Sequence, residues 1–452
     1  MTIRFRRKLL AFFIVLFIIL GALVVLYSQG YRLDTSSFSL TKIGALYIES
    51  YQRPIHIYLN ETYYKDKSGL LTKGTLIPSV IPKKYQVSIQ KDGFLEYTKN
   101  IEIFPSQVVR FFNILLVPKD ISYTKHVIAS SSNMILDDIM TRGLITHETT
   151  QKGNQFTIHT IPTDSTQASS TALLIQKVLT PISKQKFSHY LFYSNNPSEL
   201  IATSSTGIYR IDTTEPAVTL LSSSTLPYAY TIQDNILTFI DSSLETKSST
   251  STATVKTKQP KDTNPLASLT RIDIHSGSTT YIPFLTAQRV QSITSLYTKN
   301  NFIAFITTDK SLILYDTDKK IETILNQNVT SALFSPDAKK LLYRSGDGKV
   351  HIYFIKDELE TLDAHAGDDI ILSLIHTSGI RTIEWYQDSA HLILMYPEEI
   401  RLAEVTRKEP NNQPLIWQGL YLMASYAPDQ NNLIFATSPT EVVQIDFATF
   451  IQ

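Results

Sequence analysis

The hydrophobic and polar positions of this chain follow three successive patterns, and the first is an unbroken apolar run near the N-terminus. Residues 9–27 contain no charged side chain, whereas residues 1–8 carry four basic ones. At a helical rise of about 1.5 Å per residue the run reaches about 28 Å, which matches a bilayer's hydrocarbon core of about 30 Å. The pattern predicts a transmembrane helix over residues 9–30 that follows a basic cytoplasmic tail, residues 1–8.

The charges on either side of the apolar run predict how the helix is oriented. Positive flanks stay in the cytoplasm, and the first charged residue after the run is Arg32. We therefore expect a single-pass protein of the cytoplasmic (inner) membrane, with its N-terminus inside, residues 9–27 in the membrane and the bulk of the chain extracytoplasmic. A cleaved signal peptide is the alternative. Its apolar region is usually about 7 to 15 residues long and precedes an A-x-A site, and no such site follows this run.

The second pattern, between residues 44 and 118, alternates apolar and polar residues over short segments. A spacing of two places the apolar residues on one face of a β-sheet. The residues on this face are Leu46, Ile48, Ile55, Ile57, Leu59, Tyr85, Val87, Ile89, Ile101 and Ile103. Pro78, Pro82 and the Asp92-Gly93 pair are turn signals between the strands. We expect a small β-sandwich over residues 44–118, connected to the helix by a linker over residues 31–43.

The third pattern, over residues 119–452, is a degenerate repeat of an aromatic residue, an aspartate turn and three apolar residues. The aromatic and aspartate positions of the three clearest copies are Phe334 and Asp337, Trp385 and Asp388, and Tyr426 and Asp429. The copies start 51 and 41 residues apart (334 to 385 and 385 to 426), close to the length of about 40 to 50 residues that a four-stranded propeller blade needs. Weaker copies start at Tyr193 and Tyr297.

A further candidate strand follows each copy of the repeat. These strands are predicted over residues 208–212, 312–316, 350–354, 400–405 and 442–447. Division of residues 119–452 by the blade length predicts a β-propeller of about seven blades, with a pair of separate β-sandwiches as the alternative. Residues 242–265 interrupt the pattern, because they are rich in Ser and Thr and contain no aromatic side chain. We expect them to form a disordered insertion, with a flexible binding arm as the alternative.

Two parts of the chain resemble known families of β proteins. Residues 85–94 (YQVSIQKDGF) resemble the tyrosine-led strand and Gly-aromatic turn of the PEGA domain, and residues 57–60 (IYLN) resemble its hairpin entry. Residues 52–55 (QRPI) replace the tetrapeptide that names the family. The resemblance implies a small, non-catalytic β-sandwich of bacterial envelope proteins, used for adhesion or as a stalk. Residues 335–341 (SPDAKKL) resemble the S-P-D-G-x-x-L turn of TolB-type and tryptophan-aspartate-repeat propellers, with alanine in place of glycine.

Composition limits the chemistry that the chain can perform. With 42 basic and 41 acidic residues the net charge is +1, so nucleic acid is not an expected partner. The absence of cysteine excludes disulfides, thiol catalysis and thiolate metal sites. The densest group of possible metal ligands comprises Asp363, His365, Asp368 and Asp369. Because this group lacks the alternating spacing of a calcium loop, and an acidic connection between two blades is expected there, we predict neither a metal nor a cofactor.

The sequence motifs that carry catalysis in known enzymes are missing. G-x-S-x-G, H-E-x-x-H and G-x-G-x-x-G are all absent, so we do not expect an enzyme. The expected function of this mainly-β protein is binding or scaffolding at the cell envelope, with the propeller presenting an interaction surface to a protein or glycan. An extracytoplasmic propeller hydrolase and a purely structural envelope spacer are the alternatives.

Overall fold

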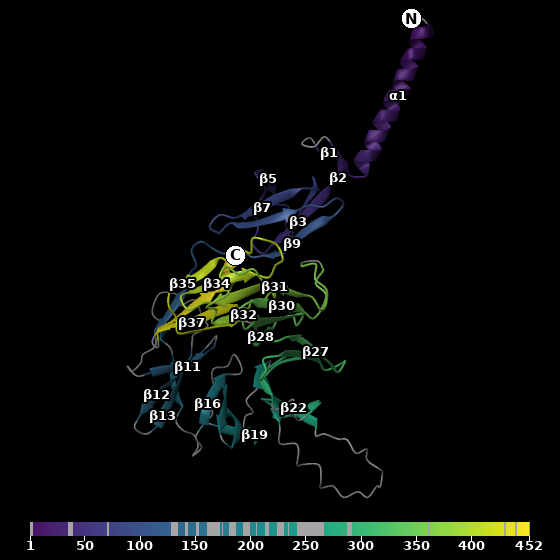
Figure 1. Cartoon of the computed structure of the whole chain (residues 1–452). Coiled ribbons are helices and arrows are strands. Elements are labelled where there is room, and N and C mark those ends of the chain that lie inside the picture. The colour runs from purple at the N-terminus through teal and green to yellow at the C-terminus, as the bar shows by residue number, and fades with distance from the viewer. Residues whose placement is uncertain are drawn as a thin grey trace, which may run out of the picture.

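The structure is a computed structural model, and it is mainly β with one N-terminal apolar helix (Figure 1). The described residues are 3–34, 39–69, 72–127, 134–140, 143–150, 153–160, 172–173, 175–179, 187–192, 199–204, 206–212, 217–223, 230–233, 235–241, 266–286, 292–359, 362–428, 431–438 and 441–451. The predicted insertion at residues 242–265, and Asp429 of the third repeat, lie outside them.

Helix α1 (Ile3–Ser28) begins six residues before the predicted span, so most of the basic tail is helical. Its segment Leu9–Ser28 is long and apolar enough to cross a membrane, and none of this segment is buried inside the protein. A core-facing helix keeps a polar face, and this segment has none. A helix of this kind is either a membrane anchor or a signal sequence.

The segment after the helix, which we predicted to be a linker, contains a β-hairpin. Strands β1 (Tyr31–Asp34) and β2 (Ser39–Lys42) pair antiparallel in a two-stranded sheet of their own. Each strand has four residues and a single aliphatic side chain, so the alternation that reveals other strands did not reveal them.

Residues 44–118 form two small sheets around one core, and we call them the two-sheet unit. One sheet has the order β6-β3-β9 and the other the order β5-β4-β7-β8. The strands are β3 (Gly44–Ser50), β4 (His56–Leu59), β5 (Thr62–Lys65), β6 (Thr75–Val80), β7 (Lys84–Gln90), β8 (Tyr97–Glu102) and β9 (Val108–Ile114). Nine of the ten residues predicted for the buried face belong to the single core that the two sheets share, and the tenth, Tyr85, is half-buried and packs against this core.

The turn signals of the two-sheet unit were only partly correct. Pro82 and Asp92-Gly93 lie between strands as expected, and Gly93 has a φ of 83° in the turn. Pro78 instead lies inside β6, so its assignment as a turn was wrong. Because β6 is an edge strand, the missing N–H of a proline removes no hydrogen bond from the sheet interior.

The rest of the described chain forms seven sheets, which we call the seven-sheet body. Six of them have four strands each, in the orders β11-β12-β13-β15, β16 to β19, β20 to β23, β24 to β27, β28 to β31 and β32 to β35. Their strands are β11 (Met134–Met140), β12 (Gly143–Thr150), β13 (Gly153–Thr160), β15 (Ile175–Leu179), β16 (Phe187–Phe192), β17 (Glu199–Ser204), β18 (Gly207–Asp212), β19 (Ala217–Ser222), β20 (Tyr230–Gln233), β21 (Ile236–Asp241), β22 (Leu266–Asp273), β23 (Thr279–Thr286), β24 (Ile293–Lys299), β25 (Phe302–Thr307), β26 (Leu312–Asp316), β27 (Ile321–Asn326), β28 (Val329–Phe334), β29 (Lys340–Ser345), β30 (Val350–Phe354), β31 (Asp369–Ile371), β32 (Thr382–Trp385), β33 (His391–Met395), β34 (Glu399–Glu404) and β35 (Leu415–Gln418).

The seventh sheet joins the two ends of the body. Its order is β14-β10-β38-β37-β36, from β10 (Thr124–Val127), β14 (Ala172–Leu173), β36 (Met423–Ala427), β37 (Asn432–Ser438) and β38 (Glu441–Asp446). Strand β10 enters the body and pairs antiparallel with β38, the last strand of the chain, with His126 opposite Val442. The five candidate strands that follow the repeats are confirmed as β18, β26, β30, β34 and β38, within one residue at most boundaries.

The aspartate turns predicted from the repeat are present in its first two copies. Phe334 ends β28, and the carboxylate of Asp337 accepts hydrogen bonds from the Ser335 hydroxyl (2.6 Å) and the Lys339 N–H (3.1 Å). Ala338 has a φ of 57°, in the left-handed region that glycine adopts most readily. In the second copy Trp385 ends β32 and Asp388 occupies the turn to β33. Tyr426 of the third copy lies in β36.

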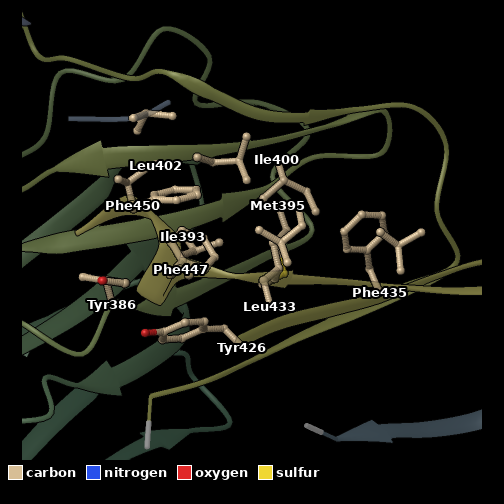
Figure 2. Close-up of a cluster of buried hydrophobic side chains, with 14 of the residues drawn as sticks. Tyr386, Ile393, Met395, Ile400, Leu402, Tyr426, Leu433, Phe435, Phe447 and Phe450 are labelled. Atoms are coloured by element: carbon tan, nitrogen blue, oxygen red, sulfur yellow. The ribbon is translucent and has the colours of Figure 1, made fainter. Parts of the chain in front are cut away.

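A core of aromatic and aliphatic side chains fills the space between the sixth and seventh sheets (Figure 2). Tyr386, Tyr426, Phe447 and Phe450 pack with ring centroids 4.6 to 5.7 Å apart. Phe447 and Phe450 come from the C-terminal 3-10 helix η3 (Phe447–Phe450). Leu115 and Val117, from the segment that leaves the two-sheet unit, belong to the same core, so this packing also connects the unit to the body.

Candidate functional site

The two-sheet unit and the seven-sheet body meet through buried polar side chains, and we call this contact the joint. Gln52, which follows β3, is fully buried and makes hydrogen bonds with three backbone atoms of two residues. Its amide nitrogen donates to the carbonyls of Leu116 (2.9 Å) and Phe450, and its amide oxygen accepts from the Leu116 N–H (2.9 Å). One side chain thereby ties the start of the unit to the end of the chain.

A buried ion pair lies at the centre of the joint. Lys99 in β8 is fully buried, and its ammonium lies 2.9 Å from a carboxylate oxygen of Glu404 in β34. The ammonium also donates to the carbonyls of Lys408 (3.0 Å) and Pro410 (2.7 Å), and the Tyr97 hydroxyl donates to Glu404 (2.9 Å). The ammonium thus has two hydrogen bonds and a partner charge, and a buried ammonium is tolerated when it is paired and hydrogen-bonded in this way.

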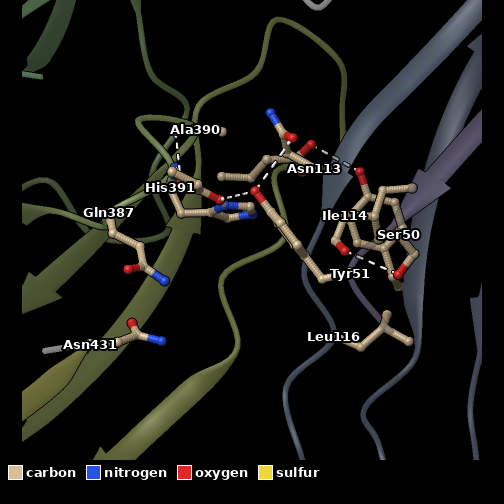
Figure 3. A network of polar contacts seen from close by, with 12 residues as sticks. Ser50, Tyr51, Asn113, Ile114, Leu116, Gln387, Ala390, His391 and Asn431 are labelled. Carbon is tan, nitrogen blue, oxygen red and sulfur yellow. Dashed lines mark hydrogen bonds and ion pairs between the residues drawn. The ribbon is translucent and has the colours of Figure 1, made fainter. Parts of the chain in front are cut away.

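A second buried pair, Asp388 and His391, lies beside the first. Their side chains are 7% and 5% exposed, and Nδ1 of His391 lies 2.7 Å from Oδ2 of Asp388. Tyr51 of the two-sheet unit points toward this pair (Figure 3), and its hydroxyl donates to Asp388 (3.3 Å). Asp388, identified in the sequence only as a turn residue, therefore has a second role in holding the unit and the body together.

The charges around this pair shift both of its pKa values. Burial alone would raise the pKa of the Asp388 carboxyl, but the charge of His391 and hydrogen bonds from His391 and Ala390 lower it. Burial alone would lower the pKa of His391, but the charge and hydrogen bond of Asp388, and the charge of Glu404, raise it. The pair is therefore an ion pair over the pH range between the two pKa values.

We predict that the Asp388–His391 pair stabilises the protein most between about pH 4 and pH 6.5. The contribution of Asp388 is present above its unfolded pKa of 3.8 and is lost as the pH falls through the lowered value. The contribution of His391 is present below its unfolded pKa of 6.5 and is lost as the pH rises through the raised value. The melting temperature of His391→Gln should fall below that of the wild type most in this window, by the equivalent of about 1 to 3 kcal/mol.

His275, whose side chain is 49% exposed, lies 3.9 Å from Glu199 and supplies the control for this measurement. His275→Gln should change the melting temperature little at any pH, because exposed ion pairs contribute about 0 to 1 kcal/mol. An equal effect of His391→Gln at pH 5 and pH 9 would contradict the assignment.

A half-open cavity of about 360 Å³ lies against the joint. Tyr97, His391, Glu404 and Asn411 contribute polar atoms to its lining, and Leu402 contributes apolar surface. Both polar atoms of the Asn411 amide are buried without a hydrogen-bond partner among the described residues. A buried amide of this kind is ordinarily satisfied by water or by a bound group, so the cavity has room and polarity for either.

Glu384 in β32 is a further titratable group that the sequence patterns did not single out. Its carboxyl is partly buried, and within the described part of the chain no hydrogen bond or ion pair reaches it. Burial raises its pKa from 4.5 to about 7. The folded protein therefore takes up a proton at Glu384 at a pH where the unfolded chain does not.

Glu384→Gln should stabilise the protein at alkaline pH. A carboxyl with a raised pKa costs no stability below its unfolded pKa of 4.5, and the cost grows as the pH rises toward about 7. The amide has no charge to bury, so the variant should gain about 1 to 2 kcal/mol over the wild type at pH 8 and nothing at pH 4. Melting temperatures of the variant and the wild type between pH 4 and pH 8 test this prediction. Glu102 is exposed, so Glu102→Gln is the matched control. A difference in stability between Glu384→Gln and the wild type that is the same at every pH would contradict this prediction.

The four candidate metal ligands of the sequence do not converge. Asp368 pairs with Arg407 (2.8 Å), and Asp369 accepts from the Tyr343 hydroxyl and lies 3.3 Å from His351. His365 lies 3.9 Å from Asp357. Within the described residues, no group of three or more His, Asp or Glu side chains is arranged to hold a metal ion.

The placement of this group between two blades was also wrong. Asp363, His365 and Asp368 lie in the connection from β30 to β31, and Asp369 begins β31, so the group lies within one sheet. Strand β31 has three residues and begins with a charge, so it does not show the apolar alternation of longer strands.

The sequence patterns did not reveal the joint, although one signal was present. Tyr97, Lys99 and Ile101 alternate with exposed or half-buried residues along β8 and are all buried. A lysine on the buried face of a strand needs a partner charge, and that partner, Glu404, is 305 residues away (404 minus 99). No local pattern identifies a partner at such a separation.

Comparisons with known proteins do not assign the chain to a family. No family model matches it, and no curated protein matches it. One similar solved structure is PorZ, described as an essential bacterial surface component of the type-IX secretion system of Porphyromonas gingivalis. It is 10% identical with a TM-score of 0.40, over 70% of this chain and 37% of that chain.

A second similar structure is the computationally designed protein Ika8, which is 12% identical with a TM-score of 0.38, over 71% of this chain and 100% of that chain. This chain thus spans little more than a third of the length of PorZ. At these TM-scores neither likeness bears on function.

Proposed function

We propose that this chain is a membrane-anchored, extracytoplasmic scaffold or binding protein, in which the two-sheet unit acts as a stalk and the seven-sheet body presents an interaction surface to a protein or glycan of the cell envelope. The observation that carries the proposal is the joint. Gln52 and Lys99, which are fully buried, and the half-buried Tyr51 connect the unit to the body through hydrogen bonds and an ion pair. Buried polar networks of this kind favour one orientation over others, because any other orientation leaves charges unpaired.

Helix α1 supports the proposed location at a membrane. Leu9–Ser28 is apolar on all sides, and none of it packs against the rest of the protein. Its N-terminal flank is basic, which favours an N-terminus inside and a body outside. The hairpin and the two-sheet unit follow within a few residues, so a retained helix would hold the unit close to the membrane surface.

We further propose that the seven sheets are the blades of a β-propeller and that the two-sheet unit is a PEGA-like sandwich. Neighbouring sheets contact each other through edge strands: β20 contacts β24, β24 contacts β28, and β36 contacts β11. Such contacts fit sheets arranged around a common axis. The pairing of β10 with β38 fits ring closure, in which the first and last strands of the body share a blade.

Cysteine labelling tests the location and topology, because the natural chain has no cysteine to remove. A cysteine that replaces the exposed Ile324 in β27 should react with a membrane-impermeant maleimide in intact cells. A cysteine that replaces Thr2 should react only after permeabilisation. The opposite pattern, or a mature chain that has lost residues 1–28, would overturn the anchored topology.

Capture of partners tests the binding role. The full chain, in native membranes, should be cross-linked to a saturable envelope partner, identified by mass spectrometry for proteins and by glycan analysis. Loss of this partner when the body is deleted would support presentation by the body. Absence of a partner, together with turnover of esters, peptides or glycosides by the purified chain, would instead support an extracytoplasmic hydrolase.

A further inference from the structure

The β1–β2 hairpin exposes an amphipathic face next to the end of the apolar helix. Tyr31 and Leu33 alternate along β1, and Leu40 and Lys42 alternate along β2, so all four side chains lie on the same face of the two-stranded sheet. Leu33 is directly opposite Leu40, and the two side chains are 56% and 54% exposed. Within the described chain, no apolar surface covers this pair.

The hairpin is held tightly to the helix end. Arg32, on the opposite face, donates to the carbonyls of Tyr27 (3.0 Å) and Tyr31 (2.9 Å), and its guanidinium carbon lies 3.5 Å from the centre of the Tyr27 ring. The N–H of Ile43 donates to the carbonyl of Gly30 (3.0 Å), which closes the base of the hairpin. A cation bonded to the Tyr27 carbonyl, in the last turn of the helix, also complements the negative end of the helix dipole.

The residues of this region match the composition of a membrane–water boundary. Tyrosines concentrate at that boundary, and lysine and arginine place their charges among lipid headgroups while their stems remain in apolar surroundings. Tyr27 and Tyr31 flank the helix end, and Lys42 lies with its ammonium 5.4 Å from the centre of the Tyr31 ring. The hairpin starts three residues after the helix ends. Whatever contacts its apolar face must therefore lie at the depth of the membrane–water boundary.

We propose that the β1–β2 hairpin lies in the membrane interface of the same bilayer that α1 crosses, with Leu33 and Leu40 inserted at the level of the upper acyl chains and Lys42 beside a lipid phosphate. The proposal rests on the proposed anchoring by α1. It makes the hairpin a second membrane contact, and a helix with a second contact cannot rotate freely about its axis. Together with the joint, this contact would set the direction in which the seven-sheet body faces.

The test uses the full chain with a single cysteine in place of Leu33, labelled with an environment-sensitive fluorophore. The chain is reconstituted into vesicles of phosphatidylcholine and phosphatidylglycerol that carry a spin-labelled lipid quencher. The label at position 33 should emit at shorter wavelength and be quenched by the lipid. A label at Ile324, which is 60% exposed and lies in the body, is the matched control and should remain in water.

A second arm tests the contact with lipid phosphate. The Lys42→Gln change should lower the fraction of inserted hairpin about fivefold, the effect of one lysine near an anionic surface. Omission of phosphatidylglycerol, which leaves the zwitterionic phosphates of phosphatidylcholine, should lower it in the same direction. Unchanged quenching in both cases would overturn the phosphate contact.

The outcomes separate this proposal from the anchoring on which it rests. A chain that floats with the vesicles but keeps label 33 in water, with the same result for a label that replaces Leu40, overturns the interfacial hairpin and leaves the anchor intact. A chain that does not float with the vesicles overturns both.

Discussion

Replacement of Lys99 by methionine should lower the free energy of unfolding of the protein by about 3 to 5 kcal/mol, because it leaves the carboxylate of Glu404 buried without its cation. Methionine keeps the length and most of the apolar stem of the lysine, so the change removes charge and hydrogen bonds with little loss of packing. The carbonyls of Lys408 and Pro410 lose their donor as well. The joint should therefore loosen before the cores on either side of it unfold.

Two measurements on the purified full chain separate these effects. Denaturant unfolding gives the loss of stability, and proteolysis of native protein reports opening of the segment around Lys408. Lys125→Met is the matched control, because Lys125 pairs with Glu441 at 3.1 Å but is 48% exposed. That variant should change stability by about 0 to 1 kcal/mol. Equal losses of stability in Lys99→Met and Lys125→Met would show that the buried ion pair contributes no more than the exposed one.

A second variant completes the test of the pair. Adding Glu404→Gln to Lys99→Met removes the uncompensated charge, so the double variant should recover part of the stability that the single variant loses. The size of the recovery measures the coupling between the two side chains. A double variant whose loss is the sum of the two single losses would contradict a direct pairing across the joint.

Replacement of Phe447 by alanine should also cost about 3 to 5 kcal/mol, the range for large aromatic side chains removed from a core. Phe447 is fully buried, and its ring lies 5.6 Å from that of Tyr386 and 4.6 Å from that of Phe450. The cavity would lie between the sixth and seventh sheets (Figure 2). Because Gln52 donates to the carbonyl of Phe450, the change should weaken the joint as well as the core.

Ile451→Ala is the control for this variant, since Ile451 follows the same 3-10 helix but is 38% exposed. It should change stability by less than about 1 kcal/mol. Hydrogen exchange of the Leu116 N–H, which donates to Gln52, reports the effect on the joint. Faster exchange in Phe447→Ala but not in Ile451→Ala is the expected result. Unchanged exchange in both variants would show that loss of packing in this core does not weaken the joint.

The elements that were predictable are those whose signal is local. The apolar run of α1 needs no information beyond its own length and flanks. The alternation of Ile57 with Leu59, and of Val87 with Ile89, likewise identifies strands and their buried face, because the side-chain period of a strand is two. The turn at Asp337 was predictable for the same reason: the hydrogen bonds that its carboxylate accepts come from residues two positions away.

Short strands and edge positions were predicted less well. Strands β1, β2 and β31 are too short for a period to stand out, and they fall in segments taken as a linker or an acidic connection. Pro78 marks a turn in most contexts, but an edge strand accommodates it because one side of such a strand has no pairing partner. In each case the deciding fact is the position of the strand in the sheet, which neighbouring residues do not encode.

The sequence by itself determined the apolar helix, the β-rich character of everything after it, the buried faces of the longer strands and the aspartate turns of the repeat. Only the tertiary structure decided that Lys99 meets Glu404, that Asp388 serves both a turn and the joint, and that the last strand pairs with β10. The physical reason is the range of the interactions. Periodicity and turn chemistry act over a few residues, whereas the pairing of Lys99 with Glu404 depends on the path of more than 300 residues between them.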